Sequence, residues 1–337
     1  MIPAIFGLSG TVLGAEERAF FRAADPAGYI LFGRNVESRE QLRALTESLR
    51  EIHGRDRLLI SIDQEGGRVA RMQPPVWAKW PAGAAFDRLY DLAPASAIEA
   101  ARLNYEAMGH DLTEAGITCT HAPVLDVRQA GAHDVIGDRA LGHEPLRVAA
   151  LGRAVLDGLA RAGVLGTIKH MPGHGRAGAD SHKELPTVTA SDAELERDIA
   201  PFRALADAPI AMTGHIRFTA WDDRNPATQS PFVVEEIIRK RIGFGGLLLT
   251  DDLDMEALSG TVPERARRAL DAGCDIALNC WGRIVDMEGI AALCPDITDA
   301  GAARLEAALG AIRLDGAAGR QAELLAARDA LLGLMAA

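Results

Sequence analysis

The feature that most constrains the fold is a short apolar segment, rich in β-branched residues, which recurs eight times along the chain. The eight segments are residues 2–8, 28–32, 58–63, 117–125, 164–170, 209–215, 246–251 and 275–279. Most are followed by a polar or glycine-containing turn and a helical pattern, and this alternation predicts a parallel sheet buried on both faces. Eight strand–helix units favour a closed (β/α)8 TIM barrel over an open doubly wound sheet, although one missed or spurious strand would reverse that choice.

Two of the helical patterns between these segments are clear. The first has apolar residues along one face, namely Val148, Leu151, Val155, Leu159 and Ala162. Gly163 can end this helix, and Gly243 can end a second one that begins near residue 233. From about residue 297 the chain is rich in Ala and Leu, which predicts one or two helices outside the ring of the barrel. Because a barrel commonly takes about 250 residues plus insertions, residues 1–337 are expected to form a single domain.

Charge and composition argue against several classes of partner. The formal net charge of -11 would repel a nucleic-acid backbone, and no basic stretch compensates for it. No apolar run approaches the ~18 residues of a membrane span, and the amino terminus lacks the basic region of a signal peptide. The 4 cysteines include no C-x-x-C pair, so we interpret them as structural thiols. We therefore expect a cytoplasmic monomer that acts on a small molecule, without nucleic-acid or membrane partners.

Polar residues gather just after the apolar segments, where the predicted strands end. In a (β/α)8 barrel the carboxyl ends of the strands build the active site. The polar side chains at these ends are Asp63, Glu65, Arg68, Asp126, Lys169, His170, His215, Asp251 and Asp252. This distribution predicts a charged site at the carboxyl-terminal face of the barrel.

Several of these residues also have a purely structural interpretation. Asp63 and Asp126 could cap the helices that follow them or pair with arginines. His215 could equally be a core histidine whose hydrogen bonds are satisfied inside the protein. For Glu65 and Arg68 we favour a structural ion pair with each other, below the pocket, over a part in the chemistry.

The segment KHMPGHGRAGADSH, residues 169–182, is the most specific one. His170 and His174 have the spacing of two zinc ligands on a helix face, but the proline and glycines around them make a helix improbable. A metal site remains an alternative, and it would use His170, His174, Asp180 and His182. The preferred interpretation is that Asp180 orients the His182 imidazole on a glycine-rich loop, so that His182 can close over a substrate and exchange protons.

Asp251 is the first charged side chain after the buried run 247–249, which is the position expected of a nucleophile or an electrostatic stabiliser. Asp252 follows it directly. Because successive side chains of a strand point in opposite directions, only one of the two is expected to face the pocket. The sequence alone does not say which one.

At these residues the chain resembles family 3 of the glycoside hydrolases, and in particular its short, single-domain bacterial β-N-acetylglucosaminidases of cell-wall recycling. The matching segments are GYILFGRNV (28–36), SIDQEGGRVAR (61–71), APVLDV (122–127), VIGDRALG (135–142), GTIKHMPGHGRAGADSHKELP (166–186), AMTGHI (211–216) and GLLLTDDLDM (246–255). They follow the order of the family and span most of the chain. The KH-PGHG-DSH block is highly specific.

The resemblance implies a (β/α)8 barrel and a retaining mechanism that passes through a covalent glycosyl-enzyme. Asp251 matches the nucleophile of the family, His182 its acid/base and Asp180 the partner of that histidine. The positions that hold the sugar match Asp63, Arg71, Arg139, Lys169 and His170. The resemblance implies no metal or cofactor. Most glycosidases use two carboxylates for this chemistry, so the His–Asp pair is a departure that the family shares.

The implied substrate is a terminal, non-reducing β-linked N-acetylglucosamine on a muropeptide fragment that carries anhydro-N-acetylmuramic acid, with or without peptide. Three alternatives stay open. The first is a metal-dependent barrel hydrolase that uses the histidines as ligands, and the second is a sugar-binding regulator without turnover. The third is a related phosphorylase, because a neutral histidine tolerates an incoming phosphate better than a carboxylate would.

Overall fold

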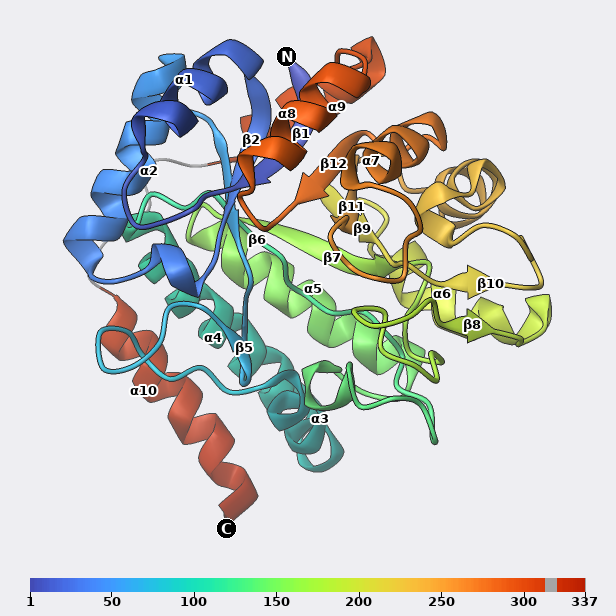
Figure 1. Ribbon diagram of the computed structural model, residues 1–337. Coiled ribbons are helices and arrows are strands. Elements are labelled where there is room, and N and C mark those ends of the chain that lie inside the picture. The colour runs from blue at the N-terminus through green and yellow to red at the C-terminus, as the bar shows by residue number, and fades with distance from the viewer. Residues whose placement is uncertain (313–319, 337) are drawn as a thin grey trace.

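Eight parallel strands close into a barrel in the computed structural model, which describes residues 1–312 and 320–336 (Figure 1). The strands are β1 (Ile2–Gly7), β2 (Pro26–Leu31), β3 (Leu59–Ile62), β6 (Cys119–Thr120), β7 (Leu165–Met171), β9 (Ile210–Thr213), β11 (Leu247–Asp252) and β12 (Ile276–Asn279). They pair in the order β1-β12-β11-β9-β7-β6-β3-β2, and β2 returns to β1. Each predicted apolar segment supplies one strand, so the (β/α)8 barrel is confirmed.

Helices surround the barrel on its outer side (Figure 1). They are α1 (Ala15–Ala24), α2 (Arg39–His53), α3 (Gly83–Leu92), α4 (Pro94–Glu114), α5 (Pro145–Arg161), α6 (Asp192–Ala204), the π-helix η4 (Val233–Ile242), α7 (Val262–Asp271) and α8 (Ile284–Leu293). Helix α5 and helix η4 confirm the two clear helical patterns. Gly163 follows α5 with φ 83° and Gly243 caps η4 with φ 82°, both in the left-handed region that glycine adopts without strain.

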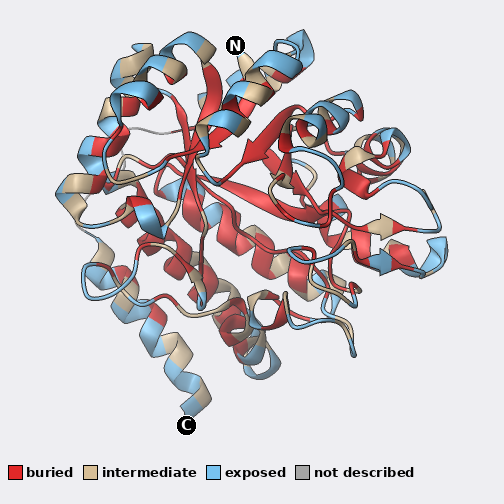
Figure 2. Cartoon of the chain, viewed as in Figure 1, coloured by how far each residue is buried: buried red, intermediate tan, exposed pale blue. Residues whose placement is uncertain are grey.

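Alternate side chains of each strand point into the barrel or out toward the helices. Ile5 and Leu247 belong to the apolar cluster inside the barrel. Their chain neighbours Phe6 and Leu248 belong to the outer cluster, which packs against the helices. Both faces of the sheet are therefore buried, which Figure 2 shows as red strands inside helices with pale blue outer faces. This burial explains why the strands are continuous apolar runs in the sequence.

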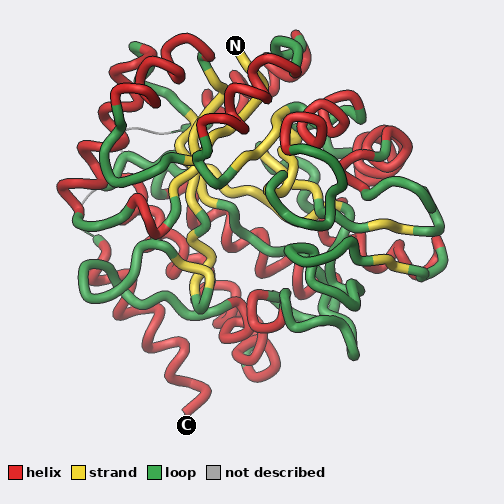
Figure 3. The backbone as a smooth tube through the Cα atoms, in the orientation of Figure 1, coloured by secondary structure: helices red, strands yellow, loops and turns green. Residues whose placement is uncertain are grey.

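The fourth strand is much shorter than the predicted segment 117–125. Only Cys119 and Thr120 form β6, because Pro123 has no backbone N–H to donate to a neighbouring strand. After an irregular stretch that follows Thr120, Val124 forms an isolated parallel β-bridge with Lys169. The chain then reaches Asp126. Two small ribbons were not predicted, namely β4 (Gln64–Gly66) with β5 (Val69–Ala70) and β8 (Thr187–Val188) with β10 (Arg217–Phe218). They interrupt the loops between barrel strands and helices, and Figure 3 draws them as short yellow stretches within green.

The carboxyl-terminal helices lie in two different places. Helix α10 (Gln321–Leu332) packs against α4 outside the barrel, as expected. Helix α9 (Asp299–Gly310) instead covers the amino-terminal end of the barrel, where Leu305 and Ala308 join the inner cluster. Arg304 Nη1 also lies 2.7 Å from Asp275 Oδ1, just before β12 begins. The prediction of one or two carboxyl-terminal helices outside the ring is met by α10, and α9 closes the bottom of the barrel with its apolar face.

All 4 cysteines carry free thiols, and all but Cys294 are buried, as expected for structural thiols. Among the described residues, no helix is both long and apolar enough to span a membrane.

Candidate active site

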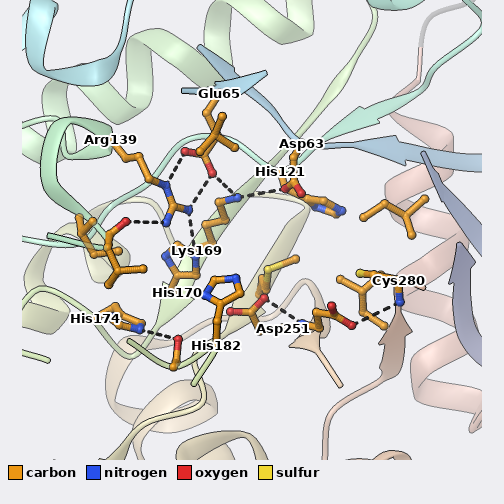
Figure 4. A pocket seen from close by; sticks show the side chains of 18 of the residues that line it. Asp63, Glu65, His121, Arg139, Lys169, His170, His174, His182, Asp251 and Cys280 are labelled. Atoms are coloured by element: carbon orange, nitrogen blue, oxygen red, sulfur yellow. Dashed lines mark hydrogen bonds and ion pairs between the residues drawn. The ribbon is translucent and has the colours of Figure 1, made fainter. Parts of the chain in front are cut away.

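A pocket of about 200 Å³ opens at the carboxyl ends of the barrel strands (Figure 4). Seven of the eight site residues predicted from the sequence line it, namely Asp63, Arg71, Arg139, Lys169, His170, His182 and Asp251. The eighth, Asp180, lies directly behind His182. Residues from β2, β3, β7, β9, β11 and β12 and their loops contribute to the lining, so the closed barrel brings distant parts of the chain to one place.

One wall of the pocket is a chain of alternating charges. Lys169 Nζ lies 2.5 Å from Glu65 Oε1 and 3.4 Å from Asp63 Oδ1. Arg139 donates to both oxygens of Glu65 at 2.8 Å, and Arg71 Nη2 donates to Asp63 Oδ2 at 2.9 Å. Figure 4 shows Lys169 between the two carboxylates. Each buried charge thus has an opposite charge beside it, which is the condition for keeping it ionised away from water.

The two carboxylates of this wall are ionised. Burial alone would raise the pKa of Asp63, but the positive charges of Lys169 and Arg71 hold it well below the ordinary range. Burial likewise opposes ionisation of Glu65, and the positive charges of Arg139 and Lys169 lower its pKa to about 2. The wall therefore presents fixed acceptors and donors to a polar ligand at neutral pH.

The predicted ion pair between Glu65 and Arg68 is wrong. Glu65 pairs with Arg139 and Lys169, whereas Arg68 Nε donates to Asp138 Oδ1 at 2.8 Å. The turn at Gly66 and Gly67, with φ 101° and 57°, separates the two side chains. It leaves Glu65 buried and Arg68 on the exposed side.

Replacing Glu65 by Gln is expected to lower the free energy of unfolding by about 3–5 kcal/mol, because Arg139 would stay buried without its charge partner and Lys169 would keep only Asp63. Urea unfolding of the two proteins measures the difference. Asp138→Asn is the matched control, since it breaks the exposed ion pair of Arg68 and should cost at most about 1 kcal/mol. Equal small losses in both variants would contradict the prediction.

Asp251 and Asp252 both line the pocket, which contradicts the expectation that only one would. The register between β11 and β12 shifts after Leu249, so strand alternation no longer separates the two side chains there. The backbone N–H of Asp252 donates to Asp251 Oδ1 at 2.8 Å. Asp252 Oδ1 accepts from the backbone of Asp254 at 3.1 Å and of Cys280 at 3.3 Å.

The two neighbouring carboxyls differ in how readily they ionise. Burial opposes ionisation of Asp251, but His170, His215, the N–H of Asp252 and Lys169 lower its pKa below the ordinary value. Burial raises the pKa of Asp252, and the carboxyls of Asp254 and Asp251 raise it further. Asp251 is therefore the charged member of the pair, and Asp252 keeps its proton more readily.

The variant Asp252→Asn is expected to be more stable than the unchanged protein, by an amount that grows with pH. A carboxyl whose pKa is raised on folding costs stability as pH rises from its unfolded pKa of about 4 toward its folded pKa. The carboxamide does not titrate, and it keeps the oxygen that accepts both backbone hydrogen bonds. The free energy of unfolding of the variant should therefore exceed that of the unchanged protein by about 1–3 kcal/mol at about pH 8. Urea unfolding at about pH 5 and about pH 8 tests this. A difference that does not change with pH would contradict it.

The loop after β7 brings a histidine–carboxylate pair to the mouth of the pocket. Asp180 Oδ1 accepts from His182 Nδ1 at 2.9 Å and from the His182 backbone N–H at 3.0 Å. Burial opposes ionisation of Asp180, but these hydrogen bonds from His182 lower its pKa below the ordinary value. Because a carboxylate can only accept, Nδ1 carries the proton and Nε2 is left for the pocket. The His182 side chain is 63% exposed, so a ligand can reach it.

Asp126 lies behind the pocket, and within the described part of the chain it neither caps a helix nor pairs with an arginine. It is fully buried, and its Oδ2 lies 2.6 Å from His170 Nδ1. Its Oδ1 accepts from the backbone N–H of His174 at 2.7 Å. His170 has φ 116°, a strained value for a residue other than glycine, so Asp126 holds a histidine ring and a strained turn together.

Sequence reasoning missed His121, which lines the pocket beside Asp63 (Figure 4). Its Nδ1 lies 3.2 Å from Thr167 Oγ1, and burial lowers its pKa to about 4, so the ring is neutral. Within the run TCTHAPV no signal separates a pocket histidine from a core one. His215 proves to be a core histidine, because Thr228 Oγ1 at 2.7 Å and the Asp252 carbonyl at 3.0 Å occupy both ring nitrogens.

The alternative metal site is not assembled. Across residues 1–312 and 320–336, no group of three or more His, Cys, Asp or Glu side chains is arranged to hold a metal ion. His170 pairs with Asp126, and His174 pairs with Ser181 at 3.0 Å. A pocket at the strand ends of a closed barrel, with partnered carboxylates and a histidine oriented by a carboxylate, is instead typical of a barrel enzyme with acid–base chemistry.

The chain matches the Glycosyl hydrolase family 3 N terminal domain over residues 12–309 and belongs to this family. It is 41% identical over 283 residues to a Beta-hexosaminidase of Alkalilimnicola ehrlichii, covering 82% of this chain and 80% of the relative. A Beta-hexosaminidase of Aromatoleum aromaticum is 38% identical over 312 residues, covering 90% and 86%. The crystal structure of NagZ from Neisseria gonorrhoeae in complex with N-trifluoroacetyl-D-glucosamine aligns with a TM-score of 0.88 and 32% identity, covering 98% and 97%.

Proposed function

We propose that this glycoside hydrolase is a retaining β-N-acetylhexosaminidase that releases terminal, non-reducing β-linked N-acetylglucosamine from muropeptide fragments. The observation that carries the proposal is that an ionised carboxylate, Asp251, and an oriented histidine, His182, line one pocket. The names of the relatives and the ligand of the similar NagZ structure support the sugar. Residues 1–337 would act as one catalytic domain in the cytoplasm, and both points stay predictions.

In this proposal the charged wall binds the sugar. Asp63 accepts hydrogen bonds from sugar hydroxyls, while Arg71, Arg139 and Lys169 donate to sugar oxygens. His170 supports the same region through Arg139, whose Nη2 lies 3.4 Å from His170 Nε2. Because the ion pairs already fix these side chains, the sugar meets a site that needs little rearrangement.

The first chemical step forms a covalent intermediate. A carboxylate oxygen of Asp251 bonds to the anomeric carbon while the bond from that carbon to the aglycone oxygen breaks. The His182 imidazolium gives its Nε2 proton to the departing oxygen, and Asp180 stabilises the positive ring through Nδ1. The aglycone then leaves as a neutral alcohol.

The second step returns the enzyme to its starting state. Neutral His182 takes a proton from water as the water oxygen bonds to the anomeric carbon, and the bond to Asp251 breaks. Asp251 is a carboxylate again and His182 an imidazolium. Two inversions at the same carbon leave the released sugar with its original β configuration.

The test uses a disaccharide of N-acetylglucosamine and anhydro-N-acetylmuramic acid, with and without peptide, and N,N′-diacetylchitobiose as the comparison substrate. We expect release of β-N-acetylglucosamine, seen by proton NMR before mutarotation, and faster cleavage of the muropeptide substrates than of chitobiose. Formation of a sugar 1-phosphate only in phosphate buffer would identify a phosphorylase instead. Loss of activity on chelation would favour the metal-dependent alternative, and binding without turnover would indicate a regulator.

A further inference from the structure

His174 is a conspicuous residue of the 169–182 segment to which the proposed mechanism gives no task. Its side chain lies in the protein interior, 3% exposed, and its ring centroid is 5.7 Å from that of His170. Its Nε2 lies 3.0 Å from Ser181 Oγ, and Ser181 is itself only 2% exposed. This hydrogen bond joins the start of the loop to the residue between Asp180 and His182.

The protonation of His174 can be assigned from its surroundings. Burial lowers its pKa to about 4, so the ring is neutral at physiological pH. Its Nδ1 is buried and has no hydrogen-bond partner among the described residues. A buried N–H without an acceptor is costly, whereas Nε2 has Ser181 Oγ within reach, so Nε2 carries the proton and donates to the serine.

The loop is held as far as Ala177, whose carbonyl accepts from the His133 backbone at 2.9 Å, and this restraint is lost at the next residue. Gly178 is exposed, and a Cβ added there would meet no atom within 4 Å. After this open stretch the chain turns inward again at Ser181, and beyond it the carbonyl of His182 accepts from the Glu256 backbone at 3.3 Å. Ser181 is thus the point where the returning chain is fixed to the barrel side of the loop.

We propose that the hydrogen bond from His174 to Ser181 is a latch that holds His182 in position for proton transfer. The inference rests on the proposed function, since it deepens the role of the His182 loop. Asp126 bonds both to the ring of His170 and to the backbone of His174. The latch therefore ties the acid/base to the strand end that supports the sugar site, and His174 and Ser181 are positioning residues.

The experiment compares two aryl β-N-acetylglucosaminides that differ in their need for an acid. Phenol leaves poorly without a proton, whereas 2,4-dinitrophenolate leaves without one, and kcat/KM reports the steps up to departure of the aglycone. For Ser181→Ala we expect kcat/KM on the phenyl substrate to fall by about 10- to 100-fold, because small misplacement of a catalytic group has effects of this size. On the dinitrophenyl substrate it should fall by less than about threefold.

Controls separate the latch from a general loss of structure. Lys183→Ala changes an exposed residue of the same loop whose side chain makes no hydrogen bond among the described residues, and it should leave both substrates unaffected. Ser181→Thr keeps the hydroxyl and should restore most of the phenyl activity. If Ser181→Ala does not fold, His174→Phe removes the same hydrogen bond while keeping a ring. Where both fold, the double variant should be no worse than the more damaged single one.

Equal losses on the two substrates, or strictly additive losses in the double variant, would overturn the latch. His182→Ala serves as the reference for the underlying mechanism. If His182→Ala shows the selective loss on the phenyl substrate and Ser181→Ala does not, the latch alone fails. If His182→Ala shows no selective loss either, the proposed acid/base itself is wrong.

Discussion

Replacing Asp251 by Asn is expected to lower kcat by a factor on the order of 10⁴ or more, with the fold intact. The carboxamide has the shape of the carboxylate but neither its charge nor its ability to bond to the anomeric carbon. Loss of the ionised member of the Asp251–Asp252 pair removes the group on which the proposed covalent intermediate forms. Initial rates on an aryl β-N-acetylglucosaminide measure the effect.

The neighbouring carboxyl supplies the control for this experiment. Asp252→Asn makes the same chemical change one residue away in the same pocket, but at a group that keeps its proton more readily. It should retain most of the activity. Mass spectrometry after incubation with a slow fluorinated substrate should then place a sugar on the peptide 246–255 of the unchanged protein and not of Asp251→Asn. A labelled Asp251→Asn variant, or equal activity losses in the two variants, would exclude Asp251 as the nucleophile.

The variant His182→Ala is expected to lose about 10²- to 10⁴-fold in kcat/KM on the phenyl substrate and far less on the dinitrophenyl one. The methyl group cannot give a proton to the departing oxygen, and only the poorer leaving group needs it. The same variant should hydrolyse the intermediate slowly, because no base takes the proton of water.

Azide gives an independent readout for His182→Ala. This anion attacks the glycosyl-enzyme without needing a base, so added azide should raise kcat on the dinitrophenyl substrate and yield the β-glycosyl azide. Azide should not rescue Asp251→Asn, which forms no intermediate. A His182→Ala variant that loses both substrates alike and does not respond to azide would contradict an acid/base role for His182.

The barrel could be predicted because its signal is local. Each strand is a continuous apolar run, as in the segment 246–249, and each run ends in polar residues that a closed parallel barrel must gather at one face. The sequence positions alone therefore placed Lys169, His170 and Asp251 in one site, and the structure brings them together there.

The errors concern pairings that depend on distant residues. Glu65 pairs with Arg139, which is 74 residues away in the sequence. This pairing depends on how the loop after β6 folds over the pocket. The orientation of Asp252 depends on a register shift against β12. In the sequence His121 lies within a predicted strand, but β6 ends at Thr120, before Pro123. The four-residue spacing of His170 and His174 carries no helical meaning, since the two rings face different partners across a strained turn.

Among the described residues, apolar side chains fill the barrel beneath the pocket, and Leu305 and Ala308 of helix α9 close the end opposite to it, so the pocket opens at the strand ends. Under the proposed mechanism both products must leave through the opening by which the substrate came in. The terminal sugar occupies the blind end while the aglycone lies toward the mouth, so the aglycone departs first and the freed monosaccharide last. Release of the monosaccharide is then a separate step that can limit turnover, and accumulated monosaccharide competes with fresh substrate for the same space.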